Sequence, residues 1–319
     1  MQISEIKDQV IRADFRIRKY IRETYLEYSP LFSELAGCKA FMKLENLQHT
    51  GSFKVRGALN KILSLSREEL ERGVVTASTG NHGAAVAFAL SQLGSEGLIF
   101  IPENASETKI EAIRRIGGVI RHHGTDNADT EIFAREYADQ NNMTFISPYN
   151  DPMVVSGQGT IGIEMLKQLV EIDTVIVSVG GGGLISGIAG YLKAIKPGIN
   201  VIGCSPENSQ VMIQSVRAGK ILDLPSLPTL SDGTAGGLEP GAITFEFCRS
   251  LVDDYITVTE DEIIHAMKLF MSSHHMLIEG AAGVALASVL KYKKQLRGRN
   301  IVVIICGGNI SLETLKTLL

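Results

Sequence analysis

The chain has 319 residues, of which 45% are hydrophobic and 21% charged, and its formal net charge is −4. This length predicts one or two globular domains whose core is large enough to need no covalent cross-links. There is no basic stripe, which argues against nucleic acid as a partner. No apolar run is long enough to span a bilayer, which argues against an integral membrane protein.

The N-terminal segment and the cysteines indicate a reducing compartment. The segment MQISEIKDQVIRADFRIRKY is charged and amphipathic, unlike a signal peptide. The cysteines Cys38, Cys204, Cys248 and Cys306 are scattered, with no CxxC pair and no His pair nearby. This spacing argues against a zinc site and a disulfide framework, and we expect a cytoplasmic protein.

Short runs rich in Val and Ile alternate with helical periodicity along the chain. The predicted strands cover 40–45, 73–78, 97–102, 118–124, 144–148, 174–179, 200–205, 254–259 and 300–306. The predicted helices cover 53–65, 81–93, 106–116, 127–141, 157–170, 184–195, 260–274 and 280–293. Strand–helix alternation is typical of an α/β fold with mostly parallel, twisted sheets covered by helices. A Pro/Gly-rich stretch at 221–237 is expected to form a long loop.

The alternation divides into two units. A compact group of strand–helix pairs at 74–146 interrupts a larger unit, so we predict a large domain from 1–66 and 150–319 and a small domain at 74–146. Ligands of open α/β sheets collect beyond the carboxyl ends of the strands, where helix N-termini point inward. Four glycine-containing loops are expected at such places.

The first loop, HTGSFKVRG, carries Lys54 into the first turn of a predicted helix. The core-facing stripe of that helix comprises Val55, Ala58, Leu59, Ile62 and Leu63. Lys54 lies beside this stripe, where partial burial and the positive end of the helix dipole would both lower its pKa. A neutral amine is the nucleophile that forms a Schiff base. The alternative is an ordinary solvated lysine on a helix surface.

The second loop, ASTGNHGAA, follows the strand at 73–78. Its small residues at a predicted helix start are Ser78, Thr79, Gly80, Asn81 and Gly83. Backbone N–H groups and hydroxyls at a helix N-terminus suit a carboxylate, although an ordinary N-cap is the alternative. His82 is expected to be structural rather than a catalytic base.

The third loop, VIVSVGGGGLISG, places four consecutive glycines between a buried strand and a helix. Backbone N–H groups freed of side chains can wrap a phosphate there, and a tight structural turn is the alternative. The loop is no GxGxxG fingerprint, because Ile185 or Ser186 stands where the third glycine must be. It also lacks the Gly-Lys-Ser/Thr of a nucleoside triphosphate loop, so a single phosphate fits best.

The fourth loop, VVIICGGNIS, delivers Cys306 at the end of a buried strand, followed by two glycines and Asn309. Cys306 could be a core residue, a neutral hydrogen-bonding partner or a nucleophile, and the absence of an adjacent base disfavours the last role. A lysine, a phosphate cradle, a carboxylate cradle and a neutral partner for a ring nitrogen together match the needs of pyridoxal 5′-phosphate.

The motifs TGSFKVRGA, STGNHG, GGGGLISG and CGGNIS resemble those of the serine/threonine dehydratase group of fold type II pyridoxal-phosphate enzymes, which includes serine racemase. The resemblance covers nearly the whole chain with the motifs in the family's order. It implies the tryptophan-synthase-β-like fold, with two domains of which the small one moves to close the site, and a homodimer.

The resemblance also implies roles for matching residues. Lys54 would form the Schiff base with the cofactor, Phe53 would pack on its ring, Asn81 would bond its phenolic oxygen, and Cys306 would face the pyridine nitrogen. The phosphate would be held by Gly180, Gly181, Gly182, Gly183 and Leu184. The substrate carboxylate would be held by Ser78, Thr79, Gly80 and Asn81. Glu279 in IEGAAG matches a family glutamate near the ring, and a carboxylate that merely satisfies a helix dipole is the alternative.

Two departures from relatives bear on the chemistry. Serine racemases carry serine at the position of Thr79, so racemisation is disfavoured, although a threonine hydroxyl could still supply the proton. Relatives that bind a divalent cation place acids where this chain has Ser205 and Val211, and Glu207 is shifted from those positions. Because Mg²⁺ and Ca²⁺ prefer carboxylates, we expect no metal site.

The expected reaction is α,β-elimination from a β-hydroxy amino acid, giving a 2-oxo acid and ammonia, with L-threonine and L-serine as first candidates. Alternatives are 3-hydroxyaspartate, phenylserine or a hydroxyectoine-derived amino acid as substrate, or serine racemisation. The chain ends shortly after CGGN, without the regulatory domain of feedback-controlled relatives, so we expect a catabolic or specialised role.

Rival classes fit the residues less well. A nicotinamide-dependent dehydrogenase would need the GxGxxG loop that is missing, although Glu207 is tolerably placed for the acid that such an enzyme uses. A catalytically dead binding protein would be expected to have lost Lys54 or the glycine tetrad, and neither is lost.

Overall fold

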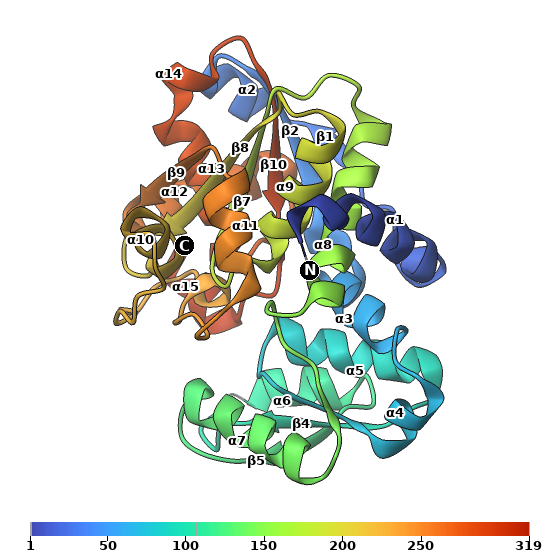
Figure 1. Cartoon of the computed structure of the whole chain (residues 1–319). Coiled ribbons are helices and arrows are strands. Elements are labelled where there is room, and N and C mark those ends of the chain that lie inside the picture. The colour runs from blue at the N-terminus through green and yellow to red at the C-terminus, as the bar shows by residue number, and fades with distance from the viewer. Residues whose placement is uncertain (1, 106, 319) are drawn as a thin grey trace.

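The computed structural model describes residues 2–105 and 107–318, which form two lobes, each built on one β-sheet (Figure 1). The larger sheet has the strand order β1-β2-β10-β7-β8-β9 and the smaller β5-β4-β3-β6. The larger sheet consists of β1 Leu26–Tyr28, β2 Lys39–Leu44, β7 Thr174–Ser178, β8 Asn200–Pro206, β9 Asp254–Val258 and β10 Asn300–Ile305. The smaller sheet consists of β3 Val74–Ala77, β4 Gly97–Ile101, β5 Val119–His122 and β6 Thr144–Phe145.

All nine predicted strands are present within one to three residues at each end, and the predicted α/β class is confirmed. The pairs within both sheets are parallel except β1–β2, which is antiparallel. Strand β1 was not predicted, because it has only three residues and its outward side chains are exposed. The strands of the smaller sheet all fall within the range 74–146, between strands of the larger sheet in the chain.

Helices cover both sheets and separate their strands along the chain. In the first half they are α1 Ile6–Ile17, α2 Pro30–Ala36, α3 Lys54–Ile62, α4 Arg67–Arg72, α5 Asn81–Leu93, α6 Glu107–Arg114 and α7 Asn127–Gln140. In the second half they are α8 Pro152–Gln168, α9 Gly183–Ile195, α10 Val211–Ala218, α11 Ile243–Leu251, α12 Glu260–His274, α13 Gly280–Lys291, α14 Lys293–Leu296 and α15 Leu312–Leu318. Ser106, the first residue of one predicted helix, lies outside the described residues.

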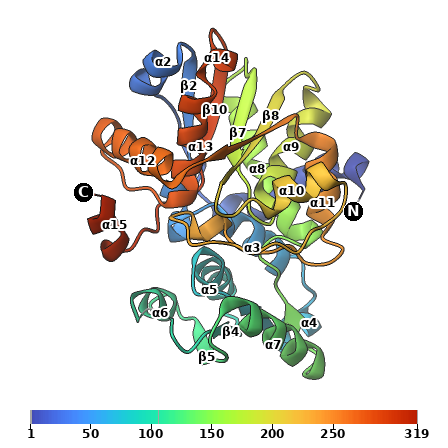
Figure 2. The ribbon, with the colours of Figure 1, turned by 90° about the vertical axis from the view of Figure 1, so that its left-hand side faces the viewer.

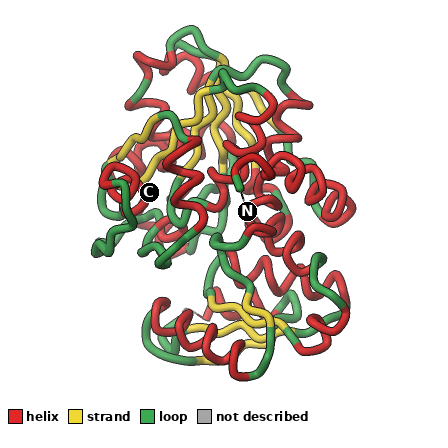
Figure 3. The backbone as a smooth tube through the Cα atoms, in the orientation of Figure 1, coloured by secondary structure: helices red, strands yellow, loops and turns green. Residues whose placement is uncertain are grey.

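The strands form two separate groups, one in each lobe (Figure 3). In the view turned by 90°, α3 lies next to α5 of the small lobe (Figure 2). The predicted apolar stripe of α3 is buried, with Leu63 half-buried, and it packs against Ala85, Val86 and Leu90 of α5. Helix α3 therefore carries Lys54 along the junction between the lobes. No helix within the described ranges is long and apolar enough to cross a membrane.

Candidate active site

Lys54 is held at the first position of α3 by the strand end next to it. The Phe53 backbone N–H donates to the Cys306 carbonyl at 3.0 Å, which ties the start of α3 to the end of β10. The half-buried Lys54 amine donates to the Pro148 carbonyl at 2.9 Å and lies 5.3 Å from the centre of the Phe53 ring. Burial lowers the pKa of Lys54 to about 8, against the opposing attraction of Glu279. The direction of this shift is the one expected from the sequence, with burial as its cause, and it increases the neutral fraction of the amine near neutral pH.

The glycine tetrad lies beside the same segment. A Cβ on Gly181 would come within 2.4 Å of the Tyr149 ring, and one on Gly180 within 2.8 Å of the Thr234 Cα. Gly182, the N-cap of α9, has a φ of +83°, which favours glycine. The loop is therefore a tight turn that no side chain fits, and it leads directly into the N-terminus of α9. Two consecutive residues connect Lys54 to this turn. The Pro148 carbonyl accepts a hydrogen bond from the Lys54 amine, and Tyr149 packs on the glycines.

The start of α9 suits a phosphate. The first N–H groups of a helix have no acceptor within it and lie at the positive end of the dipole. Here those groups belong to Gly183, Leu184 and the residues that follow, and Leu184 itself is buried. Together with a lysine of lowered pKa at the same junction, this turn fits a cofactor that has one phosphate and one aldehyde.

The second and fourth loops meet at Glu279. The Asn81 side-chain amide donates to both carboxylate oxygens of Glu279, at 3.0 and 2.9 Å. The Asn309 backbone N–H donates to the same carboxylate at 3.3 Å, and the Cys306 Sγ lies 4.0 Å from it. Burial raises the pKa of Glu279 to about 7 despite these donors. Glu279 is therefore a buried carboxylate of raised pKa, and it is also the N-cap residue of α13, where a carboxylate satisfies the helix dipole.

The turn formed by Ser78, Thr79 and Gly80 directly precedes the N-terminus of α5. The Gly80 backbone N–H donates to the Ser78 Oγ at 3.2 Å, and α5 begins at Asn81. Ser78, Thr79 and Gly80 are half-buried, and a Cβ on Gly80 would have no atom within 4 Å. Open space therefore adjoins backbone N–H groups at a helix start, as a carboxylate site requires.

His82 is buried in the small lobe, with its Nε2 2.9 Å from the Ile146 carbonyl oxygen. Burial, with a contribution from the charge of Lys54, lowers the pKa of His82 to about 3. A ring that stays neutral and bonds the backbone fits the structural role expected for it.

Two features near Lys54 were missed in the sequence. Tyr149 packs on the tetrad and accepts a hydrogen bond from the Glu239 backbone N–H at 2.8 Å, which no local pattern predicts. The Ser52 Oγ is buried and has no hydrogen-bond partner among the described atoms. Ser52 pairs with Gly307 in an isolated bridge, so this orphan hydroxyl lies beside the loop that follows Cys306. The only feature of the sequence that could have drawn attention to Ser52 is its position in the SFK motif, two residues before Lys54.

The positions compared with cation-binding relatives have other contacts. The Ser205 Oγ donates to the Val179 carbonyl at 2.7 Å, and Glu207 lies 3.6 Å from the Lys291 amine. In the part of the chain that the structure describes, no group of three or more His, Cys, Asp or Glu side chains could hold a metal ion.

Comparison with known proteins identifies the family. Residues 17–307 match the family model described as pyridoxal-phosphate dependent enzyme. The chain is 40% identical over 308 residues to the catabolic L-threonine dehydratase TdcB of Escherichia coli K12, covering 96% of this chain and 93% of the relative. It is 38% identical over 312 residues to the L-threonine ammonia-lyase of Thermotoga maritima, covering 98% of this chain and 77% of the relative.

Among solved structures, maize serine racemase superposes with a TM-score of 0.93 at 37% identity, covering 98% of this chain and 95% of the racemase. The family model and both relatives cover most of the chain. The chain belongs to the family of pyridoxal-phosphate-dependent enzymes.

Proposed function

We propose that the protein is an ammonia-lyase that dehydrates L-threonine and L-serine to the 2-oxo acid and ammonia. Its similarity to a threonine dehydratase and a threonine ammonia-lyase over almost the whole chain supports this substrate class. The observation that carries the proposal is Lys54, whose pKa burial lowers to about 8 at the junction of the two lobes. When bound, pyridoxal phosphate supplies an electron sink for the carbanion that forms at the substrate Cα.

Lys54 has two tasks in this proposal. Its neutral amine would hold the cofactor through the aldehyde group, and the free amine would take the proton from the substrate Cα as a general base. Its hydrogen bond to the Pro148 carbonyl limits the directions in which the amine can point. The β-hydroxyl leaves, and with the proton taken from Cα it makes up one molecule of water. The enamine that remains then reacts with water to give ammonia and the 2-oxo acid.

The remaining residues bind and orient. The substrate carboxylate is assigned to Ser78, Thr79, Gly80 and Asn81 at the start of α5, and the cofactor phosphate to Gly180, Gly181, Gly182, Gly183 and Leu184. Phe53, Asn81, Glu279 and Cys306 are assigned to the cofactor ring. Glu279 already bonds Asn81, so it is suited to orient that amide toward the ring.

Racemisation of serine is the second candidate, because maize serine racemase is 37% identical and covers nearly the whole chain. It requires a proton donor on the face opposite Lys54. We assign that place to Thr79, whose extra methyl group restricts its hydroxyl rotamers. Elimination is therefore preferred, with racemisation as a slower side reaction.

We also propose a cytoplasmic homodimer. All four cysteines are buried as free thiols, as suits a reducing compartment, and twofold dimers are the commonest assembly of soluble enzymes.

The test is ammonia release from threonine, serine, 3-hydroxyaspartate, phenylserine and a hydroxyectoine-derived amino acid. We expect threonine and serine to react fastest. Lys54→Ala should abolish turnover and the visible band at about 410 nm that a lysine-bound cofactor gives. Lys61→Ala is the matched control, since Lys61 lies on the same helix and pairs with Asp151 at 2.9 Å. Turnover by Lys54→Ala would refute the assignment, and activity confined to another amino acid of the panel would refute the substrate.

A further inference from the structure

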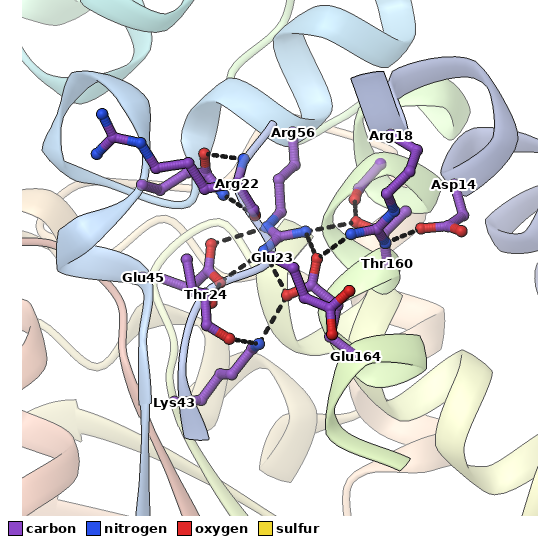
Figure 4. A network of polar contacts seen from close by, with 12 residues as sticks. Asp14, Arg18, Arg22, Glu23, Thr24, Lys43, Glu45, Arg56, Thr160 and Glu164 are labelled. Carbon is purple, nitrogen blue, oxygen red and sulfur yellow. Dashed lines mark hydrogen bonds and ion pairs between the residues drawn. The ribbon is translucent and has the colours of Figure 1, made fainter. Parts of the chain in front are cut away.

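A cluster of charged side chains is buried around Arg56, which lies on α3 two residues after Lys54 (Figure 4). Arg56 has no exposed surface, and its guanidinium lies between two buried carboxylates. Its Nε and Nη2 donate to the two oxygens of Glu45, both at 2.8 Å. Its Nη1 and Nη2 donate to the two oxygens of Glu164, at 2.8 and 2.9 Å. Two edges of the planar guanidinium are therefore used in paired hydrogen bonds, one with each carboxylate.

The carboxylates of this cluster are themselves fixed. The fully buried Lys43 amine donates to Glu164 at 2.6 Å, and the Thr24 hydroxyl donates to Glu45 at 2.6 Å. Burial alone would raise the pKa of Glu164, but the positive charges of Arg56 and Lys43 and their hydrogen bonds lower it to about 2. Glu45 follows β2 directly and Glu164 belongs to α8, so the cluster joins Arg56 to two elements of the large lobe.

The position of Arg56 relative to Lys54 is what connects this cluster to the chemistry. Two residues apart on an α-helix correspond to a rotation of about 200°, so the two side chains leave opposite faces of the first turn of α3. Holding one face against Glu45 and Glu164 therefore sets the direction in which the other face points. The bond from Phe53 to Cys306 fixes the start of the helix, and the buried Asn60 side chain donates to the Met153 carbonyl and the Ser156 Oγ of α8 further along. Of the side chains of α3 that bond other elements in this way, Arg56 is nearer than Asn60 to Lys54.

We propose that Arg56 is a positioning residue for the reaction: its guanidinium, clamped by Glu45 and Glu164, sets the rotation of α3 and thereby aims the amine of Lys54. This inference rests on the proposed role of Lys54. Apolar packing against α5 is non-directional, whereas a planar fork bonded at both edges specifies one orientation of the side chain that carries it.

Stability alone is a weak reason for such a cluster. Taking several charges out of water costs about as much as their attraction returns, and apolar replacements of buried ion pairs are often equally stable. A lysine in place of Arg56 would keep the charge but could not make two paired contacts, because its ammonium is a point charge. The cluster thus contributes more to the orientation of α3 than to the free energy of folding.

The experiment compares Arg56→Lys with Arg18→Lys in the holoenzyme. Arg18 is the matched control, since it donates to the same Glu164 at 2.7 Å from outside α3. For each variant we measure the melting temperature, kcat and KM for threonine, the isotope effect on kcat with Cα-deuterated threonine, and the visible circular dichroism of the bound cofactor. The last signal reports how the cofactor is oriented on Lys54 and does not depend on turnover.

We expect Arg56→Lys to lower kcat about tenfold to a hundredfold, as a misplacement near 1 Å does, with KM little changed. The isotope effect should rise and the dichroism of the cofactor band should change, while Arg18→Lys leaves both as in the wild type. Should Arg56→Lys fail to fold, Glu45→Gln removes the charge from one side of the clamp and is expected to change the same signals in the same direction.

The proposal is overturned if the Arg56 variant melts lower but keeps the wild-type kcat per bound cofactor, isotope effect and dichroism. That result would make the cluster purely structural. A wild-type protein that carries the cofactor on Lys54 but does not release ammonia would instead refute the proposed reaction, and the dichroism would still decide the role of Arg56.

Discussion

The chemistry proposed for Lys54 depends on what surrounds its amine. Burial is the largest influence and lowers the pKa to about 8, whereas the negative charge of Glu279 acts in the opposite direction. An amine loses its proton as the pH rises through its pKa, so the reactive neutral form of Lys54 accumulates across a range centred near pH 8. An exposed lysine reaches the same state only near pH 10.4.

This difference predicts how the protein captures its cofactor. When pyridoxal phosphate is added to cofactor-stripped protein, the rate at which the visible band appears should increase with pH and reach its half-maximum near pH 8. Stopped-flow absorbance from pH 6 to 10 measures it, with Lys61→Ala as a control that should give the same profile. A rate that still climbs steeply above pH 9.5 would show that burial does not tune this amine.

At the residue scale, the sequence singled out Lys54, the glycine tetrad and the turn at 78–81 as candidates, because each lies in a local pattern with a chemical meaning. It could not pair Asn81 with Glu279, which are 198 positions apart. Nor could it place Arg56 between its two carboxylates, one of which lies 108 positions away. Buried polar partners of this kind are set by the tertiary fold and leave no spacing to detect.

The helices that position the site pack more closely than ordinary helices because glycines face one another. A Cβ on Gly187 in α9 would lie 2.3 Å from the Val155 carbonyl oxygen and 2.6 Å from the Gly159 backbone nitrogen, both in α8. These neighbours are backbone atoms, which cannot move aside as a flexible side chain does. The approach of α9 to α8 therefore fixes where the N-terminus of α9, and with it the tetrad, is placed.

We predict that Gly187→Ala lowers the free energy of unfolding by about 2 kcal/mol or more, because overpacking against backbone outweighs the better helix propensity of alanine. The variant should also bind pyridoxal phosphate more weakly, since α9 is displaced. Urea unfolding and cofactor titration measure the two effects. Gly198→Ala is the control, with no atom within 4 Å of the added methyl group, and is expected to change stability by no more than about 0.5 kcal/mol. Equal stability of the two variants would contradict the packing argument.

At the element scale, Val/Ile-rich strands and amphipathic helices were predictable because buried parallel strands and half-buried helices each leave a clear period. Helix α8 was predicted to begin at 157 but begins at Pro152. Its start is marked by Asp151, whose carboxylate accepts from the Met153 and Val154 N–H groups. That Asp-Pro pair is a recognisable helix start, and the glycines within α8 obscured it.

The two lobes are joined at the site by polar contacts as well as by α3. Arg135 of α7 donates to the Glu239 carboxylate at 2.6 Å, and Glu239 also accepts from the Asn150 amide at 2.9 Å. The Glu239 backbone N–H in turn donates to Tyr149, which packs on the glycine tetrad. These contacts connect α7 of the small lobe to the glycine tetrad, so we expect a movement of the small lobe to shift Tyr149 at the proposed phosphate site.

Reversing this ion pair tests that connection. Arg135→Glu and Glu239→Arg should each raise KM for threonine severalfold, because repulsion opens the junction and exposes the site. The double variant should recover much of the loss, with a coupling free energy of about 1 kcal/mol. Steady-state kinetics at low salt measures the cycle, and strictly additive effects of the two substitutions would show that the pair does not hold the lobes together.

The central claim is a covalent bond between the amine of Lys54 and pyridoxal phosphate, and the most direct test is to trap it. Purified protein is reduced with borohydride, digested and analysed by mass spectrometry for peptides that carry the pyridoxyl group. The account predicts a single modified site at Lys54, with loss of the visible band and of ammonia release in proportion to the modification. A pyridoxyl group on another lysine, or none at all in protein that releases ammonia from threonine, would contradict it.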